Sequence, residues 1–371
     1  MSSEKEISGF ADTGRSETSR LALPFVSVIM PVRNEAAFIE RSVGAVAAQD
    51  YPRDRIEILI ADGMSRDGTR EIISSLQQRH TNVRVIDNPG RIVAAGLNAA
   101  LRETKGEIIV RIDGHCEVAP DYLRQCVSHL LQTQVEAVGG PVETIGESLT
   151  ARAIATAMSS RFGVGGSAFR VANSGTQFTD TVAFPAYRRS VIDRGGPFDE
   201  ELVRNQDDEY NYRLRKLGVK ILLASDIRSR YYSRATLAKL GSQYFQYGYW
   251  KVRVMQKHPR QMQLRQFVPL LFVVVLLAAL LMTPIFPAAR YFTALILGLY
   301  AVAVITASIL SARKGKWQLL PLLPIAFATL HLAYGLGFLF GLMRFWNRWG
   351  AAQSKAQSVA PIRDLDKYES I

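Results

Sequence analysis

The chain of 371 residues is poor in cysteine, since Cys116 and Cys126 are its only two. Two thiols cannot supply a disulfide framework or a cysteine-rich zinc site, and they fit a reducing compartment. No GxGxxG opens a helix and no GxxxxGK[ST] occurs, which excludes a dinucleotide fingerprint and a P-loop. The composition, 48% hydrophobic and 21% charged, excludes a disordered protein.

Acidic residues are absent from a long C-terminal stretch. No Asp or Glu lies between Ile227 and Arg363, and residues 227–371 carry 18 basic residues against three acidic ones. Residues 1–226 carry 27 basic and 30 acidic residues, so the net charge of +12 comes from the C-terminal part. A nucleic-acid protein could carry such a basic half, but its hydrophobic runs argue against nucleic acid as a partner.

Charge is missing from three apolar stretches, 266–289, 291–312 and 317–343. Each is long enough to cross a bilayer, which takes about 20 apolar residues in a helix. A buried core helix is the alternative, but a run such as LLFVVVLLAALL has no polar face and favours insertion. We therefore predict about three transmembrane helices within 266–343, followed by a polar basic tail at 344–371.

The distribution of positive charge conflicts with three crossings. Basic residues between the second and third stretches predict that this loop is cytoplasmic, which would put the basic tail outside. Prolines and glycines in the third stretch offer a resolution, because a broken helix could re-enter instead of crossing.

Residues 227–265 are basic and rich in aromatic residues. Cations interleaved with Tyr, Phe and Trp predict an amphipathic interface segment at headgroup depth, with anionic membrane lipid as a partner. An amphipathic helix docked on the soluble domain is the alternative, and both can hold. Residues 1–24 are polar and predict a disordered leader, not a signal peptide, which places the soluble half in the cytoplasm. The cations of the segment are Arg228, Arg230, Arg234, Lys239, Lys251, Arg253, Lys257, Arg260 and Arg265.

Residues 25–226 alternate apolar strands with helices. Short β-rich runs alternate with helical stretches every 25 to 30 residues or so, which predicts an α/β fold with a mostly parallel sheet and helices on both faces. Ligands of such sheets bind at the carboxyl ends of the strands, which selects the loops at 31–35, 62–69 and 113–117. The predicted strands are 26–30, 56–61, 83–86 and 107–112.

The second predicted strand ends at Asp62, which is followed by Gly63, Ser65, Asp67 and Gly68. A carboxylate here can bind a nucleobase N–H or ribose hydroxyls, and glycine lets a ligand approach the backbone. An ordinary turn has the same composition, so both interpretations stay open.

The fourth predicted strand is followed by Asp113, Gly114 and His115. An Asp and a His two residues apart can present an oxygen and a nitrogen to one divalent cation, and this pair suits Mn²⁺ better than Mg²⁺. A strand-end turn with a hydrogen-bonded histidine is the alternative.

Three adjacent acids, Asp207, Asp208 and Glu209, open a predicted helix that closes at Gly218. Acids at a helix N-terminus can simply favour the macrodipole. A carboxylate among like charges also has its pKa raised, which suits a general base near neutral pH.

These motifs together resemble the family-2 inverting glycosyltransferases of GT-A fold. The run VSVIMPVRNE at 26–35 resembles the family's opening strand, and DGMSRDGT at 62–69 resembles its second motif. Asp113 and His115 lie where the family has its metal-binding Asp-x-Asp, and 205–213 resembles the helix with its Glu-Asp catalytic pair. The resemblance covers about 25–260. With the predicted spans, the chain is most similar to the membrane glucosyltransferases of succinoglycan and related exopolysaccharide assembly.

The resemblance implies a role for each matching position. In the family's scheme the donor pocket holds a UDP-sugar, a divalent cation bridges its diphosphate, and a carboxylate takes the proton of the acceptor hydroxyl. The implied residues are Asp62 for uracil, Pro31, Arg33, Glu35 and Asp113 for the nucleotide-sugar, Asp113 and His115 for Mn²⁺ or Mg²⁺, and Asp207 as base with Glu209 in support.

The sequence also departs from the family pattern. His115 replaces the second Asp of the metal motif, which leaves the identity of the metal open, and Gln206 replaces the Glu of the catalytic pair. Gln246-Tyr-Gly-Tyr249-Trp250 resembles the Gln-x-x-Arg-Trp element of processive synthases with Tyr249 in place of Arg, which weakens a synthase interpretation. Gln246 and Trp250 are still expected to flank the acceptor.

The resemblance implies a membrane enzyme with its catalytic domain in the cytoplasm of a bacterium. We expect it to move a hexose, with glucose as the expected sugar, from a UDP-sugar to a polyprenyl-diphosphate-linked glycan. A polyprenyl-phosphate sugar transferase of the same fold is one alternative, and an inactive nucleotide-binding membrane regulator is another. A transporter is disfavoured, because the spans carry no acidic or basic residue except His331.

Overall fold

The computed structural model describes residues 23–171, 175–313 and 315–349. The part of the chain before residue 237, which includes the predicted catalytic domain and is called the catalytic half below, contains an eight-stranded sheet. The strands of this sheet run in the order β3-β2-β1-β4-β9-β6-β10-β8. Its strands are β1 (Val26–Val32), β2 (Ile56–Asp62), β3 (Val83–Asp87), β4 (Ile108–Arg111), β6 (Ala137–Gly139), β8 (Gln177–Phe178), β9 (Ala186–Arg188) and β10 (Ile221–Leu223). The leader predicted at 1–24 and the tail predicted at 344–371 fall almost wholly outside the described residues.

The sheet is mostly parallel, as predicted. β1 pairs in parallel with β2 and β4, and β2 with β3, while β9 runs antiparallel between β4 and β6. A second sheet of three strands, in the order β5-β11-β7, lies beyond the carboxyl end of β4. Its strands are β5 (Cys116–Val118), β7 (Val142–Ile145) and β11 (Ser229–Tyr232).

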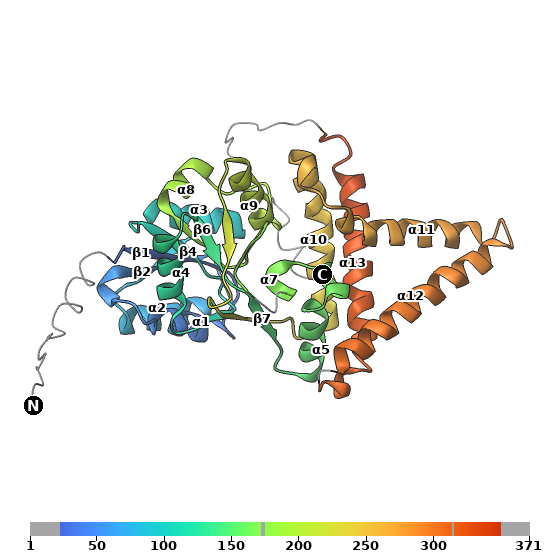
Figure 1. Ribbon diagram of the computed structural model, residues 1–371, viewed down its shortest axis with the longest axis horizontal. Coiled ribbons are helices and arrows are strands. Elements are labelled where there is room, and N and C mark those ends of the chain that lie inside the picture. Colours follow the sequence, from blue (N-terminus) through green and yellow to red (C-terminus); the bar gives the residue numbers. More distant parts are fainter. Residues whose placement is uncertain (1–22, 172–174, 314, 350–371) are drawn as a thin grey trace, which may run out of the picture.

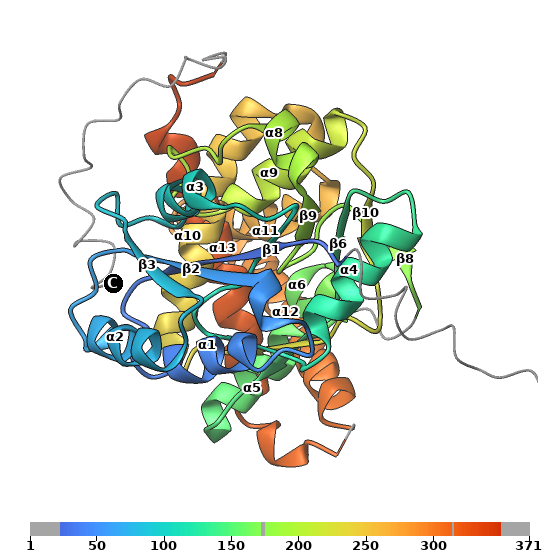
Figure 2. The same cartoon turned by 90° about the vertical axis from the view of Figure 1, so that its left-hand side faces the viewer.

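Helices cover both faces of the large sheet because its central strands are apolar on both sides. Every residue of β1 and β2 is buried. Successive residues point to opposite faces of the sheet, so Val28 and Ile29 pack into two separate apolar clusters. Figure 2 shows α3, α8 and α9 on one side of the sheet and α1 and α2 on the other. The helices are α1 (Ile39–Ala47), α2 (Thr69–Arg79), α3 (Val93–Glu103), α4 (Tyr122–Gln132), α5 (Leu149–Met158), α6 (Arg161–Val164), α7 (Ala168–Val171), α8 (Arg189–Gly195) and α9 (Gln206–Lys216).

A layer of long helices follows the catalytic half: α10 (Leu237–Lys257), α11 (Val268–Met282), α12 (Ala289–Ala312) and α13 (Leu323–Arg344). α10 and α13 pack side by side through glycines. A Cβ on Gly248 would lie 2.1 Å from the carbonyl oxygen of Tyr334, and one on Gly337 would lie 2.0 Å from that of Phe245. In Figure 1, α11 and α12 extend away from this pair as a hairpin.

The prediction of about three spans needs correction. In the described part of the chain two helices, α12 and α13, are long and apolar enough to cross a membrane. α11 has only 15 residues, about 22 Å at 1.5 Å per residue, whereas a bilayer core is about 30 Å thick. It ends at Met282 because Pro284 and Pro287 follow and cannot continue a helix.

Polar contacts connect α13 to the catalytic half along its whole length. Just before the helix, Lys316 Nζ lies 3.4 Å from Thr156 Oγ1, and near its middle His331 Nε2 lies 2.9 Å from the carbonyl oxygen of Phe162. Just after it, Arg348 pairs with Glu201 at 3.1 Å. Both ends of α13 therefore lie on the same domain.

Candidate active site

One cavity of about 490 Å³ lies at the carboxyl ends of the central strands. Its walls come from the loops after β1, β3 and β4, from α7, from the start of α9 and from α10. Of the residues predicted for the site, seven line this cavity. They are Pro31, Arg33, Glu35, Asp113, His115, Asp207 and Gln246.

The loop after β1 is held in place by the loop after β2. The backbone N–H of Asn34, a residue with a φ of 54°, donates to Ser65 Oγ at 2.9 Å, and the N–H of Glu35 donates to Thr69 Oγ1 at 2.8 Å. Arg33 packs over Gly63, where an added Cβ would lie 3.1 Å from the Arg33 side chain. The turn residues after β2 therefore shape the cavity wall that the loop after β1 forms, even where they do not line the cavity themselves.

Asp62 lies behind that wall. Its side chain is fully buried, accepts a hydrogen bond from Ser65 Oγ at 2.6 Å and pairs with Arg70 at 3.4 Å. Asp62 is not among the residues that line the cavity, whereas Asp67 from the same loop is. The predicted contact of Asp62 with uracil remains a prediction.

Arg111, the last residue of β4, connects two of the predicted functional acids. Its guanidinium donates to Asp113 at 3.0 and 3.3 Å, and its Nη1 lies 3.9 Å from Asp207 Oδ2. The side chain is only 5% exposed. A buried cation thus fixes the positions of Asp113 and Asp207, which come from segments almost a hundred residues apart.

His115 is paired with Glu35. The two side chains meet at 2.8 Å through His115 Nδ1, and the edge of the His115 ring contacts Tyr231. Burial lowers the pKa of His115, but the negative charge of Glu35 and the phenol of Tyr231 outweigh it and raise that pKa to about 9.

These residues fit a divalent cation with few protein ligands. The described residues contain no group of three or more His, Cys, Asp or Glu side chains that could hold a metal ion. A histidine that binds a metal usually donates its other ring N–H to a carboxylate, as His115 does to Glu35. The cation would have to displace a proton from His115 and take its remaining ligands from phosphate oxygens and water.

The three adjacent acids of α9 have three different environments. Asp207 is 43% exposed and lines the cavity. Asp208 pairs with Lys251 of α10. Glu209 is 4% exposed, accepts two bonds from Arg213 at 3.0 and 2.9 Å, and meets His258 at 3.0 Å.

Glu209 does not have the raised pKa expected of a carboxylate among like charges. Burial raises its pKa, but hydrogen bonds from His258 and Arg213 outweigh burial and lower it. Glu209 does not line the cavity, and its predicted supporting role stays a prediction.

The two residues expected to flank the acceptor are separated. Gln246 lines the cavity and accepts a hydrogen bond from Arg204 at 2.9 Å. Trp250, one turn further along α10, packs against Tyr249 and Phe345 in a cluster that faces α13. The structure therefore brings Gln246 to the site and does not bring Trp250 there.

The sequence analysis did not assign several cavity residues. Arg111 could have been noticed as a cation at the end of an otherwise apolar strand. Arg170 and Arg204 carry no comparable sequence signal, since they lie outside every motif. Arg234 and Lys239 were counted among the cations of the interface segment without a specific role.

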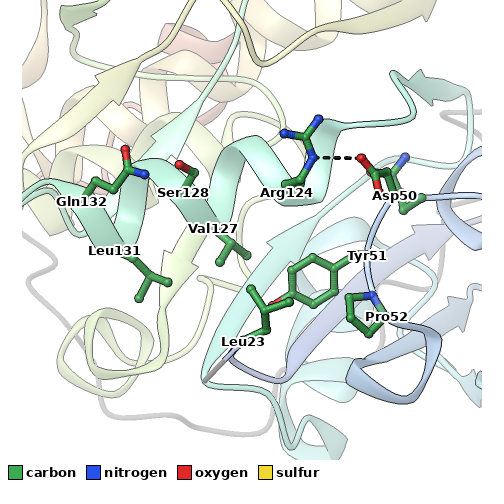
Figure 3. A pocket seen from close by; sticks show the side chains of 10 residues that line it. Leu23, Asp50, Tyr51, Pro52, Arg124, Val127, Ser128, Leu131 and Gln132 are labelled. Carbon is green, nitrogen blue, oxygen red and sulfur yellow. Dashed lines mark hydrogen bonds and ion pairs between the residues drawn. The ribbon is translucent and has the colours of Figure 1, made fainter. Parts of the chain in front are cut away.

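A second cavity, of about 660 Å³, lies elsewhere (Figure 3). It is lined by Leu23, Tyr51 and Pro52, which precede β1 and β2, and by the outer face of α4, with Arg124 paired to Asp50 at its rim. These residues lie at the amino ends of the strands. Because ligands of parallel sheets bind at the carboxyl ends, the first cavity is the candidate active site.

Comparison with known proteins agrees with this fold and site. The family model described as "Glycosyl transferase family 2" matches residues 27–196. The chain is 31% identical over 323 residues to the succinoglycan biosynthesis protein ExoA of Rhizobium meliloti, with 86% of this chain and 96% of that protein covered. It is 28% identical to the dolichyl N-acetyl-α-D-glucosaminyl phosphate 3-β-D-2,3-diacetamido-2,3-dideoxy-β-D-glucuronosyltransferase of Methanococcus voltae, over 86% of this chain and 98% of that protein.

A solved structure has the same fold. It is the mannosyltransferase PcManGT from Pyrobaculum calidifontis in complex with GDP-Man and Mn²⁺, which covers 86% of this chain and 88% of its own, with 21% identity and a TM-score of 0.54. These likenesses confirm the resemblance to GT-A glycosyltransferases and the prediction of a hexosyltransferase. The chain belongs to glycosyl transferase family 2 and is a membrane-associated glycosyltransferase of exopolysaccharide or lipid-linked glycan biosynthesis.

Proposed function

We propose that the protein transfers one hexose, with glucose as the expected sugar, from a UDP-sugar to a polyprenyl-diphosphate-linked glycan with inversion at the anomeric carbon. The observation that carries this proposal is that the three adjacent acids at the start of α9 have different environments. Asp208 and Glu209 are turned to cations outside the cavity, whereas Asp207 lines the cavity at 43% exposure with Arg111 at 3.9 Å. A carboxylate that faces the cavity can act as the base that an inverting displacement requires.

The reaction is one displacement. The acceptor oxygen bonds to the anomeric carbon as the bond from that carbon to the diphosphate oxygen breaks, and the hydroxyl proton moves to Asp207. Arg111 holds Asp207 near the reacting groups and balances part of its charge. A divalent cation, Mn²⁺ or Mg²⁺, held by Asp113 and His115 would neutralise charge on the departing diphosphate.

The site also supports a donor bound in the loops after β1 and β4. Pro31, Arg33 and Glu35 form the wall nearest the predicted cation site, and Asp67 and Arg91 continue it. The relative from Pyrobaculum calidifontis was solved with a GDP-sugar and Mn²⁺. A GDP-sugar is therefore the donor against which the UDP preference needs to be tested.

The protein is proposed to lie at the cytoplasmic face of a bacterial inner membrane. α11 and α12 form a hairpin with apolar side chains exposed over most of its surface, which suits contact with lipid tails. α13 is attached to the catalytic half at both ends. We therefore propose that the hairpin inserts in the bilayer and that its second helix brings the chain back to the cytoplasmic side. α13 then lies along the membrane surface beside α10.

A polyprenyl-phosphate sugar transferase is the second candidate. The observation that favours it is the group of cations on the cavity wall, because these would bind a lipid monophosphate as well as a diphosphate. In that reaction the lipid phosphate is itself the nucleophile and needs no base. Asp207 facing the cavity therefore favours the first candidate.

One assay tests both candidates. Membranes that contain the protein are incubated with a panel of radiolabelled UDP-sugars and GDP-mannose, with Mn²⁺ or with EDTA, and the lipid fraction is analysed. The proposal expects metal-dependent label on a lipid-linked diphosphate glycan. A single sugar on a lipid monophosphate would establish the second candidate, and tight UDP binding without turnover would indicate an inactive regulator.

A further inference from the structure

We infer that Arg170, Arg204, Arg234 and Lys239 form a binding site for the phosphate of a lipid acceptor, on the part of the cavity wall made by α7, the residues before α9 and the segment that leads into and begins α10. The inference rests on the proposed function, because it assumes that the acceptor is a lipid phosphate ester. It assigns a role to residues that no motif of the sequence covers.

The pairing of cations separates these four residues from their neighbours. Near the same elements, Lys251 pairs with Asp208, Arg253 with Glu201 at 2.8 Å and Arg230 with Glu143 at 3.2 Å. In the part of the chain that the structure describes, no carboxylate oxygen lies within 4.0 Å, the longest distance of an ion pair, of the side-chain nitrogens of these four cations. Carboxylates thus neutralise these three neighbouring cations, whereas the four positive charges in the cavity are available to a ligand.

The groups beside these cations are hydrogen-bonding and neutral. Gln243 Nε2 donates to the hydroxyls of Tyr231 at 3.2 Å and Tyr247 at 2.8 Å, and Arg204 donates to Gln246 at 2.9 Å. The guanidinium of Arg170 stacks over the Tyr231 ring. Such a wall of guanidinium, amide and phenol groups is suited to phosphate oxygens, which accept several charge-assisted hydrogen bonds at once.

The position of the four cations fits an acceptor that comes from the membrane. Lys239 and Gln243 lie on one face of α10, and the other face of this helix packs on α13 beside the apolar hairpin. Lys239 is exposed in the first turn of α10, at the mouth of the cavity. A prenyl chain in the bilayer could therefore place its phosphate on this wall while its sugar points toward Asp207.

Gln206 provides a further polar group for an acceptor whose phosphate lies on this wall. It is 5% exposed, lines the cavity and has an Oε1 atom without a hydrogen-bond partner. It lies between Arg204 and the proposed base in the sequence. A hydroxyl of the acceptor sugar would satisfy this buried oxygen between the phosphate site and Asp207.

The test measures binding, so that it does not depend on turnover. Farnesyl diphosphate and farnesyl phosphate are titrated into the full-length protein in detergent with saturating UDP and Mn²⁺, and UDP is titrated separately. The variants are Lys239→Ala, whose exposed position leaves folding intact, Arg234→Ala, and Arg234→Lys, which keeps the charge. Arg230→Ala is the matched control, because Arg230 points away from Tyr231 on the same strand and is paired with Glu143.

We expect Arg234→Ala to weaken binding of the farnesyl probes at least about tenfold, Arg234→Lys and Lys239→Ala less, and Arg230→Ala not at all. UDP affinity should change less than twofold in all four variants. An equal loss of UDP affinity would overturn the inference and assign the cations to the donor diphosphate. Farnesyl binding that no variant changes would overturn it as well. Probe binding without sugar transfer would refute the proposed function but keep the site.

Discussion

The substitution Asp207→Asn tests whether the cavity acid is a base. Asp207 Oδ1 accepts the N–H of Asp208 at 2.9 Å, and an amide oxygen can accept the same bond. The side chain is 43% exposed, so we expect the stability to change by less than about 0.5 kcal/mol. The amide cannot take the acceptor proton. Loss of general-base catalysis should lower kcat by about 10²–10⁴, which corresponds to about 2.7–5.4 kcal/mol in the barrier.

The adjacent acid provides the contrast. Asp208→Asn removes the carboxylate partner of Lys251, whose side chain is 7% exposed. Breaking a buried ion pair by removing one partner costs about 3–5 kcal/mol, and the 29% exposure of Asp208 places this case at the lower end. We therefore expect Asp208→Asn to lower the melting temperature while the folded enzyme keeps its turnover within a few-fold.

The assay must separate these two effects. Initial rates are measured at saturating donor and acceptor and divided by the folded fraction from a thermal unfolding curve, and UDP affinity is measured by calorimetry. Asp207→Asn should show wild-type stability and UDP affinity with low kcat. A turnover within threefold of wild type would refute the reasoning. So would an Asp208→Asn enzyme that is equally inactive per folded molecule.

Three further predictions concern the metal, the acid stability and the topology. Asp113→Ala should abolish metal-dependent turnover, and His115→Asp should retain it with a preference shifted toward Mg²⁺ in a metal titration; full activity of Asp113→Ala in EDTA would contradict this. Burial raises the pKa of Glu201, but Arg253 and Lys257 outweigh burial and lower it to about 2. The stabilisation of the fold by Glu201 is therefore present above the unfolded pKa of 4.5 and is lost as pH falls from 4.5 toward 2. Glu201→Gln should therefore cost up to about 3 kcal/mol at pH 7 and nothing near pH 2, as measured by unfolding curves at several pH values; a pH-independent loss would contradict the ion-pair explanation. Trp349→Cys should react with an impermeant maleimide in inverted vesicles and be protected in intact cells, because α13 is attached to the catalytic half at both ends. Both native cysteines are buried, so the label reports on position 349. The reverse pattern would show that α13 crosses.

The sheet could be predicted from the sequence because its strands are buried on both faces. The runs at 26–30, 56–61 and 107–112 are mostly apolar segments followed by turns, and they become β1, β2 and β4 with small changes at their ends. The antiparallel β9 and the small sheet of β5, β11 and β7 were not predicted. Their strands have only three or four residues, and their pairing depends on partners up to about a hundred residues away.

The strand-end rule placed the site, but the face of each side chain was not predictable. Seven of the predicted residues line one cavity, because loops at the carboxyl ends of parallel strands meet there. Asp62, Glu209 and Trp250 do not line it. Each is turned away by a partner that sequence spacing does not reveal: Arg70 for Asp62, the pair Arg213 and His258 for Glu209, and Phe345 for Trp250.

The charge of the interface segment shows the same limit. Composition alone describes nine cations without acids and predicts attraction to anionic lipid. In the structure five of these nine cations pair with carboxylates far away in sequence, such as Asp208 for Lys251 and Glu201 for Arg253. Of the other four, Arg234 and Lys239 line the cavity. The segment is therefore better described as a dock for α13 and a wall of the active site than as a uniformly basic surface.

The topology that we propose rests on contacts and not on hydropathy. A charge-free run of 27 residues satisfies any length criterion for a span, and α13 fulfils it. However, a helix that crosses a bilayer places its ends about 30 Å apart on opposite sides, and a water-soluble domain cannot hold both. Lys316 contacts Thr156 at one end of α13 and Arg348 contacts Glu201 at the other, so the catalytic half holds both ends. In the proposed topology, a surface position for α13 would also keep Arg344 and Arg348 on the cytoplasmic side, which would remove the conflict with the positive-inside rule. It would leave α10 between the cavity and the membrane, where the proposed lipid-anchored acceptor would reach Asp207 without leaving the bilayer.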